Sequence, residues 1–402
     1  MCAANRLAVT YRRMVHRRKR SRAHWVWLIV VLFLACAGRN QLQSSSKHPR
    51  AHSDPVATTP TTSTTAPQNA GATNGALSFF LTPSPEGLKP VADVIASARV
   101  SIKMFMFHLS EKSMVQALIQ ARARGVDVRV ILDGKILASR SSQKIVAELR
   151  DAGVVVTPSS PEFSITHAKA MVIDDRRALI MSLNLTTLFA KTRDYAILTE
   201  DPAQVSEFLR VFDADVANAE ARTKTTPQLS CSTLLWSPVN SEAKLVALIE
   251  SAKTSIVATS ENLGDPAIDH ALEAAAARGV RTRVLAPLCD MNPNALFNVP
   301  IAREMDAQKV DARLMPGPSS PELPYIHAKM ILVDDARGYV GSVNFSENST
   351  RHARELGILF DDRAAVAGIA AAFESDFAKA APPPADTTGV CAHHVESAPE
   401  SN

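Results

Sequence analysis

The sequence predicts an α/β protein made of two duplicated α/β/α sandwich domains, because it repeats once in register and alternates strands with helices. The segment Ile95–Ile102 returns as Ile249–Ile256, and Ala123–Val130 returns as Ala277–Val284, each 154 positions later (95 to 249, 123 to 277). A repeat of this length is typical of a duplicated domain rather than a solenoid of short units. With 46% hydrophobic and 21% charged residues, the composition excludes collagen-like and wholly disordered chains.

Both copies show the same order of elements. We expect a helix, a strand, a second helix that ends at Gly125 or Gly279, and an apolar β-branched strand. The expected helices span 87–99, 112–124 and 142–152 in the first copy and 242–253 and 268–278 in the second. The expected strands span 101–107, 126–132 and 154–157, then 255–260 and 280–285. This alternation predicts a sheet covered by helices on both faces.

The ends of the chain differ in composition from its body. We place the two domains at 76–225 and 226–380, with a disordered Ser/Thr/Pro-rich linker at 39–75 and a disordered tail at 381–402. Residues 1–38 combine a basic arm with an apolar run, Trp25–Ala37, which is shorter than the ~20 residues of a membrane-spanning helix. This order predicts an export signal, and hence a periplasmic or secreted body. A cleaved peptide, lipidation at Cys36 and an uncleaved anchor that tethers the body to the membrane all stay open.

Charge and cysteine content narrow the classes of function. The net charge is +4, but residues 1–75 hold 11 Lys and Arg against one acid, which leaves 33 bases and 39 acids for the rest. The body is therefore acidic, which disfavours a strongly basic nucleic-acid-binding domain. Beyond the signal segment, Cys231, Cys289 and Cys391 allow one disulfide and one free thiol, with the pairing open.

Each copy also carries one set of polar residues at matching spacing. The first set comprises His167, Lys169, Asp174, Ser182 and Asn184, and the second comprises His327, Lys329, Asp334, Ser342 and Asn344. Acidic residues follow at Asp194 and Glu355. Histidine and lysine two positions apart on a strand point to one face, and a turn at the aspartate returns serine and asparagine on the next strand. Each hairpin thus offers an imidazole, an ammonium, a hydroxyl and a carboxamide in one patch.

These side chains suit a phosphodiester better than a metal ion. An ammonium beside the imidazole repels a cation, whereas lysine and asparagine donors fit phosphate oxygens. Displacement at phosphorus has an attacking and a leaving side, so two histidines on opposite sides could act as nucleophile and acid through a phosphohistidine. Asp194 and Glu355 could each orient a histidine ring. Asp174 and Asp334 could instead only shape the turns, and Ser182 and Ser342 could only satisfy backbone groups.

The two HxKxxxxD strings, each followed by SxN, resemble the HKD motif of the phospholipase D superfamily over about residues 76–380. The resemblance implies two domains related by a pseudo-two-fold axis, with one site between them that needs neither metal nor other cofactor. It also implies that His167 and His327 are nucleophile and acid/base, with His167 favoured as nucleophile. The aspartates belong to the catalytic motif, and the lysines, serines and asparagines are implied to bind phosphate. Met181 departs from the pattern where Gly341 conforms, and we expect it to crowd or shape the first half-site.

The expected function is that of a phospholipase D-like phosphodiesterase, which hydrolyses or transfers a phospholipid head group at a membrane surface. Three alternatives stay open. They are an exported endonuclease acting on DNA or RNA, a cardiolipin synthase-like phosphatidyltransferase, and a non-enzymatic scaffold that binds an anionic lipid or a partner. Members of the synthase group typically carry two amino-terminal spanning helices, whereas this chain has at most one short apolar segment. Since both motifs lie in one chain, we expect no obligate protein partner.

Overall fold

The computed structural model describes residues 77–289, 296–317, 320, 322–388 and 390–391, all within the compact unit Pro67–Asn402. The predicted basic arm, signal segment and linker lie outside the described residues. In the part of the chain that is described, no helix combines the length and apolar character needed to cross a bilayer.

The first half of the described chain forms a mixed sheet of seven strands in the order β1-β7-β6-β5-β2-β3-β4. These strands are β1 (Ser78–Thr82), β2 (Ser101–Met106), β3 (Asp127–Leu132), β4 (Val155–Pro158), β5 (Ala170–Ile173), β6 (Arg177–Met181) and β7 (Asp194–Thr199). β2, β3 and β4 are parallel, whereas β5, β6, β7 and β1 continue the sheet antiparallel. The central hairpin β5–β6 carries the first motif.

The second half repeats this topology. Its seven strands lie in the order β11-β10-β9-β12-β13-β14-β8, which matches the first sheet read from β4 to β1. These strands are β8 (Leu234–Ser237), β9 (Ser255–Thr259), β10 (Arg281–Pro287), β11 (Asp311–Met315), β12 (Met330–Val333), β13 (Arg337–Gly341) and β14 (Glu355–Phe360). The prediction of two duplicated α/β domains is confirmed.

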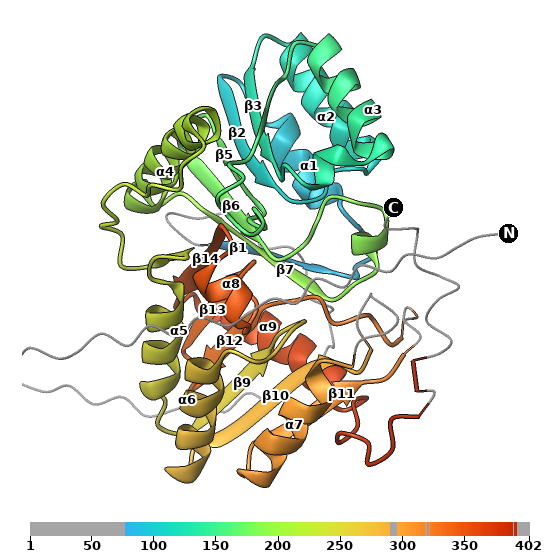
Figure 1. Ribbon diagram of the computed structural model, residues 1–402, viewed down its shortest axis with the longest axis vertical. Helices are drawn as coiled ribbons and strands as arrows, with labels where there is room; N and C mark the ends of the chain where they lie inside the picture. Colours follow the sequence, from blue (N-terminus) through green and yellow to red (C-terminus); the bar gives the residue numbers. More distant parts are fainter. Residues whose placement is uncertain (1–76, 290–295, 318–319, 321, 389, 392–402) are drawn as a thin grey trace, which may run out of the picture. The chain divides into compact units, whose positions relative to one another are not determined.

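Helices cover each sheet, as Figure 1 shows. α1 (Lys89–Ala96), α2 (Lys112–Ala123) and α3 (Arg140–Asp151) pack on the first sheet, and α5 (Ser241–Glu250), α6 (Pro266–Ala277) and α7 (Asn298–Ala307) on the second. The inner faces share one core with α4 (Pro202–Ala221) and α9 (Arg363–Phe377). Short turns complete the set: η1 (Ile136–Ala138), η2 (Leu188–Ala190) and α8 (Glu347–Arg351).

Alternate residues of each strand serve different cores. Met171 packs toward α1–α3, whereas the next residue, Val172, belongs to the core between the sheets. This follows from the two-residue period of a strand, and it explains why the central strands are apolar on both faces. The shared core fuses the two halves.

Met181 occupies a different place from the one its sequence position predicts. It is fully buried in the core beneath α1–α3, so it does not shape the substrate site. Its counterpart Gly341 pairs with Gly357, and a Cβ built on Gly341 would lie 2.5 Å from the Cα of Gly357. A Cβ on Gly357 would lie 2.3 Å from the ring of Tyr339. In the second half, the ring of Tyr339 therefore fills the space that Met181 helps to fill in the first half.

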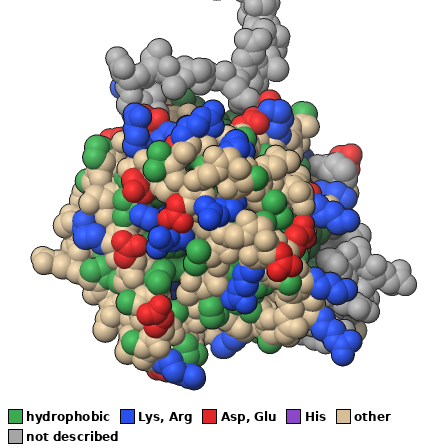
Figure 2. All heavy atoms as spheres, turned by 90° about the horizontal axis from the view of Figure 1, so that it is seen from above, with side chains coloured by type: hydrophobic (Ala, Val, Ile, Leu, Met, Phe, Trp, Pro, Cys, Tyr) green, Lys and Arg blue, Asp and Glu red, His purple; other side chains and the backbone are tan. Residues whose placement is uncertain are grey.

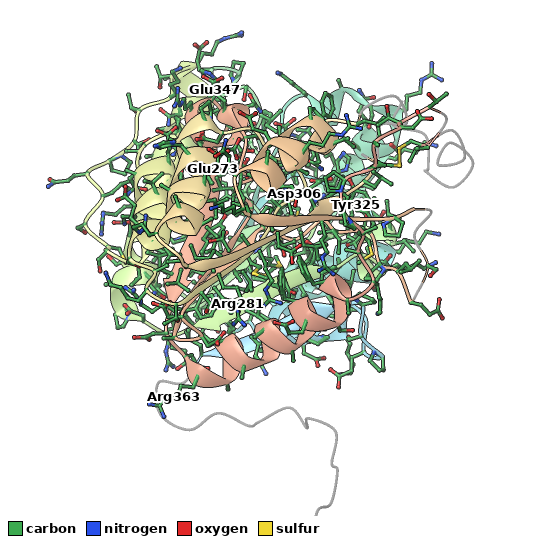
Figure 3. The ribbon with its side chains drawn as sticks, turned by 90° about the horizontal axis from the view of Figure 1, so that it is seen from below. Glu273, Arg281, Asp306, Tyr325, Glu347 and Arg363 are labelled. Atoms are coloured by element: carbon green, nitrogen blue, oxygen red, sulfur yellow. A yellow bond between two sulfur atoms is a disulfide. The ribbon has the colours of Figure 1, made fainter. Side chains whose placement is uncertain are left out.

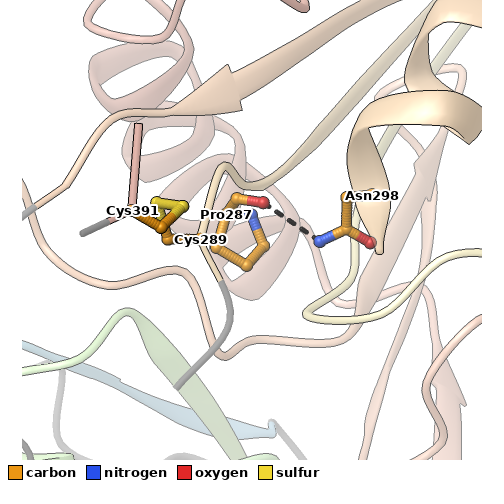
Figure 4. Close-up of a disulfide and its surroundings, with 4 residues drawn as sticks. All are labelled: Pro287, Cys289, Asn298 and Cys391. Carbon is orange, nitrogen blue, oxygen red and sulfur yellow. Dashed lines mark hydrogen bonds between the residues drawn. A yellow bond between two sulfur atoms is a disulfide. The ribbon is translucent and has the colours of Figure 1, made fainter. Parts of the chain in front are cut away.

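The described part of the tail, residues 381–388 and 390–391, has defined contacts where it was predicted to be disordered. Ala381 pairs with Leu314, and Cys391 forms a disulfide with Cys289 at the end of β10 (Figure 4). Cys231 is buried and free. The prediction of a disordered tail is wrong for these residues, because a covalent link replaces the apolar contacts that the tail composition lacks.

Candidate active site

The two histidine motifs lie at the strand ends where the halves meet. His167–Lys169 comes directly before β5, and His327–Lys329 comes directly before β12. In the first motif, the backbone N–H groups of His167 and Ala168 donate to the carbonyl of Arg354, at 2.9 and 3.1 Å. In the second motif, those of His327 and Ala328 donate to the carbonyl of Arg193, at 3.2 and 2.8 Å. Each motif is thus bound to the segment that leads into the last long strand of the opposite half.

These contacts, in which each motif binds the opposite half, form a crossing between the halves that also orients the imidazole rings. His167 Nδ1 lies 3.0 Å from Glu355 Oε2, and His327 Nδ1 lies 2.7 Å from Asp194 Oδ1. All four side chains are buried. A carboxylate at Nδ1 fixes the Nδ1–H tautomer, which leaves Nε2 for chemistry. Both acids therefore lie where the sequence analysis expected ring-orienting groups, and each serves the histidine of the other half.

Two buried arginines anchor this crossing, and sequence reasoning missed them. Arg193 pairs with Asp376 on α9 at 2.5 Å, and Arg354 pairs with Asp215 on α4 at 2.8 Å. The Arg354 guanidinium also lies over the ring of Trp236, 5.9 Å from its centroid. Each arginine directly precedes an orienting acid, and the doubled Arg-acid pair was the sequence signal that could have revealed them.

The lysines and asparagines of the motifs also lie at this junction. Lys169 Nζ donates to the carbonyl of His167 at 2.6 Å, and Lys329 Nζ donates to that of His327 at 2.5 Å. The side-chain oxygen of Asn344 accepts from the N–H of Asn262 at 3.1 Å, which turns its NH₂ group away from that backbone. Asn184 is buried, and its side-chain oxygen has no partner among the described residues. Ammonium and amide donors of this kind suit phosphate oxygens.

The serines and aspartates of the motifs have other partners. Ser182 donates to Asp194 at 2.5 Å, and Ser342 hydrogen-bonds the backbone of Leu356. Both serines were predicted to bind phosphate, but these bonds instead fix Asp194 and the backbone of β14 at Leu356. The structure thus favours the alternative of structural serines.

Asp174 and Asp334, assigned to the catalytic motif, lie at the far ends of β5 and β12 from the histidines. Both have positive φ, 54° each, and their carboxylates accept the backbone N–H groups of residues 99–101 and 253–255. They lie seven positions further along the chain than His167 and His327, which corresponds to roughly 20 Å of extended backbone. The structure does not bring them to the site, so they shape the turns.

Glu261 is the acidic side chain that sequence reasoning missed altogether. It follows β9, and its Oε2 lies 3.0 Å from Lys329 Nζ and 3.4 Å from His327 Nε2. Its Oε1 accepts a hydrogen bond from the hydroxyl of Tyr325 at 3.1 Å, a residue labelled in Figure 3. The first half has Phe107 at the equivalent place after β2, with its ring 4.8 Å from that of His167. No motif marks Glu261, because it is not repeated.

Burial dominates the electrostatics of the site. It lowers the pKa of His167 and, aided by Lys329, lowers that of His327 well below its usual value. Burial also raises the pKa of Asp194 to about 6. For Glu261 burial acts upward, but Lys329 and His327 outweigh it and lower the pKa to about 2. Glu261 is therefore an anion in contact with the second histidine.

Comparison with known proteins agrees with this geometry. The family model described as "Cardiolipin synthase, PLD-like domain" matches residues 91–216 and 245–377, one match in each half. The chain belongs to the phospholipase D superfamily. The two matches enclose both histidine motifs of this superfamily member.

Relatives of this phospholipase D superfamily member bear names from lipid chemistry. A mitochondrial cardiolipin hydrolase of Danio rerio is 32% identical, over 35% of this chain and 66% of the relative. Cardiolipin synthase B of Salmonella typhi is 25% identical, over 68% of this chain and 73% of the relative. A solved phosphatidylserine synthase of Haemophilus influenzae superimposes with a TM-score of 0.58 at 13% identity, covering 76% of this chain and 85% of that one, and shows the fold alone. The match covers between 46% and 73% of the length of curated relatives such as these, and 66% of the cardiolipin hydrolase of Danio rerio.

Proposed function

We propose that this chain is a phospholipase D-like phosphodiesterase that cleaves the head-group phosphodiester of a phospholipid through a phosphohistidine intermediate. The observation that carries the proposal is the crossed pair of histidines. Each has Nδ1 bound to a carboxylate of the opposite half, at 3.0 and 2.7 Å, so two imidazoles with defined tautomers meet at one junction.

The chemistry follows from these two rings. One neutral Nε2 attacks phosphorus, so that an N–P bond forms as the P–O bond to the head group breaks. The other imidazole, protonated, gives its Nε2 proton to the departing oxygen. Water or an alcohol then attacks the phosphohistidine and gives its proton back to that second ring. Lys169, Lys329 and the two motif asparagines would hold the phosphate oxygens.

A phospholipid is the substrate class we favour over nucleic acid. The names of the relatives support it, since cardiolipin hydrolases and synthases act on a lipid by their names. The acidic balance of the body, 33 bases against 39 acids from residue 76 onward, also disfavours a polyanionic duplex. On the face shown in Figure 2, lysines and arginines are interspersed with acids rather than gathered into a stripe. Hydrolysis and transfer to an alcohol share the first step and differ only in the second nucleophile.

The test is a substrate panel with the full chain in EDTA. Vesicles of phosphatidylglycerol, phosphatidylcholine and cardiolipin are offered with and without added glycerol, and plasmid DNA is offered in parallel. In water we expect phosphatidate and free head group as the products. If the chain is a phosphatidyltransferase, the added glycerol should give a transfer product instead. Cleavage of DNA with all lipids untouched would replace the proposal with the nuclease, and no reaction at all would favour the binding scaffold.

We infer that the folded body works outside the cytoplasm. The Cys289–Cys391 disulfide supports this, because such bonds form and persist in oxidising compartments. Cell fractionation followed by thiol alkylation tests it: we expect the mature chain beyond the cytoplasm with Cys231 as its free thiol. A fully reduced chain in the cytoplasmic fraction would contradict the inference.

A further inference from the structure

The two histidines lie in different surroundings although their strands correspond. Phe105 pairs with Ala170 in the first sheet as Thr259 pairs with Met330 in the second, so the residues two positions further, Phe107 and Glu261, occupy equivalent places. Phe107 presents its ring to His167, whereas Glu261 presents a carboxylate to Lys329 and His327. This difference lies directly on the reacting groups.

We propose that Glu261 is a positioning residue that holds a proton on Nε2 of His327, and thereby makes His327 the acid and His167 the nucleophile. The inference rests on the proposed phosphodiesterase activity and deepens it. It assigns the two roles from a residue outside the repeated motif.

The positions of the carboxylates around the two rings support this assignment. His327 has a carboxylate on each side, with Asp194 at 2.7 Å from Nδ1 and Glu261 at 3.4 Å from Nε2. The Nε2 contact with Glu261 is an ion-pair distance rather than a hydrogen bond, and a negative charge this close to Nε2 favours the imidazolium form of His327. Among the described residues, Glu355 is the single carboxylate in contact with the His167 ring, at Nδ1. A neutral His167 satisfies Glu355 and keeps a lone pair on Nε2 for attack.

The charge balance of the junction points the same way. The charged and titratable groups that face His327 are Asp194 from β7, Glu261 after β9, Lys329 on its own segment, and Lys169 and His167 from the first half. With Glu355, three carboxylates lie near the two lysines of the motifs. A bound diester adds a further negative charge. A proton on one imidazole reduces this excess of negative charge, and Glu261 favours His327 as the ring that carries it.

Glu261 also changes the pKa of His327 in the direction that the proposal requires. Burial and Lys329 together lower the pKa of His327 well below its usual value, Glu261 opposes them and raises it, and the negative charge of a bound diester acts in the same direction as Glu261. In the first step the His167 Nε2–P bond forms, the P–O bond breaks, and the His327 Nε2 proton moves to the leaving oxygen. In the second step water attacks phosphorus, returns a proton to His327, and releases His167.

The first experiment measures kcat against pH for the full chain with phosphatidylglycerol vesicles. A general acid must be protonated, so activity falls as pH rises through the pKa of His327 in the substrate complex. Glu261→Gln removes the charge at similar size, and we expect the basic limb to move to lower pH by about one unit or more. Glu261→Asp retains the charge and should restore part of that shift.

The second experiment separates acid catalysis from substrate binding. Bis(4-nitrophenyl) phosphate releases a phenolate that needs little protonation. The rate of its first-turnover burst depends little on a general acid, so we expect this rate to fall less than about threefold in Glu261→Gln. Cleavage of phosphatidylglycerol at neutral pH should fall about 10- to 100-fold, since general acid catalysis contributes on the order of 10²–10⁴.

The matched control is Glu207→Gln. Glu207 is a fully buried carboxylate on α4 that accepts the backbone N–H groups of Ser230 and Cys231, away from the histidines. We expect this variant to lower the melting temperature and leave the pH profile unmoved. A shift of the profile in the control would overturn the assignment, because it would show that any buried carboxylate moves the limb.

Two outcomes with Glu261→Gln would also overturn the inference. One is an unchanged basic limb, and the other is a lower KM with higher activity, which would make Glu261 a competitor of phosphate for Lys329. Failure of the proposed function is a separate result, since in that case the unmodified chain itself would release neither head group nor nitrophenolate.

Discussion

In the first half Phe107 lies against the ring of His167, whereas in the second half Glu261 contacts both His327 and Lys329. The frame around these side chains is nearly symmetric, with crossed carboxylates, crossed arginine pairs and matching strand orders. Duplication thus supplies two equivalent imidazoles, but a displacement at phosphorus needs one base-like nucleophile and one acid. The difference between Phe107 and Glu261 shows that the asymmetry required by the reaction lies outside the repeated motif.

The largest expected effect comes from removing each histidine in turn. His167→Ala should lose about 10⁴-fold or more in kcat/KM with every diester, because no nucleophile replaces it. His327→Ala should lose about 10²–10⁴-fold with phosphatidylglycerol yet keep a burst with bis(4-nitrophenyl) phosphate. Equal losses for both variants with both substrates would mean that the two half-sites are functionally interchangeable.

The next effect tests whether the crossed arginines bind the halves together. Arg354→Met leaves Asp215 buried and unpaired, and Arg193→Met does the same to Asp376, so each should cost about 3–5 kcal/mol in the free energy of unfolding. Urea denaturation measures this.

The control for the arginines is Arg129→Met, whose ion pair with Asp127 is half exposed and should contribute less than about 1 kcal/mol. Arg354 is fully buried and Arg193 is 9% exposed, so Arg354→Met should have the larger effect. An Arg354→Met variant as stable as the control would show that the crossing does not hold the halves.

The smallest effect concerns how each half fills its core. Gly357→Ala, which copies Ala196 of the first half, should cost about 1–3 kcal/mol because the new Cβ meets both the Tyr339 ring and the Leu235 side chain. Tyr339→Leu copies Leu179, and the double variant should cost less than the sum of the single variants. Strict additivity in thermal unfolding would contradict the exchange of volume between the two cores.

The repeated features were open to prediction from the sequence. The two α/β domains and the two histidine motifs followed from a repeat in register, because strand and helix periods are local. The orienting acids could be proposed as a pair, but their crossing could not, since sequence spacing does not tell which half an acid faces. The buried ion pairs Arg193–Asp376 and Arg354–Asp215 join residues more than 130 positions apart, beyond any local pattern.

The features that occur once were missed for a different physical reason. In the sequence, Glu261 has no feature that distinguishes it from any other polar residue after a strand. Only tertiary packing brings it into contact with Lys329. Met181 was expected near the substrate because its counterpart is a glycine, yet the strand period turns its side chain to the opposite face from Ser182. The Cys289–Cys391 link was one of several possible pairings until the tail was placed beside β10.

The most direct test of the account is to locate the covalent intermediate. The full chain is mixed with bis(4-nitrophenyl) phosphate, quenched in alkali within the burst, and digested for mass spectrometry. We predict a phosphoryl adduct on His167, present in the His327→Ala variant and absent in His167→Ala. An adduct on His327, or steady turnover with no adduct on either ring, would contradict the claim that the two halves divide one displacement between them.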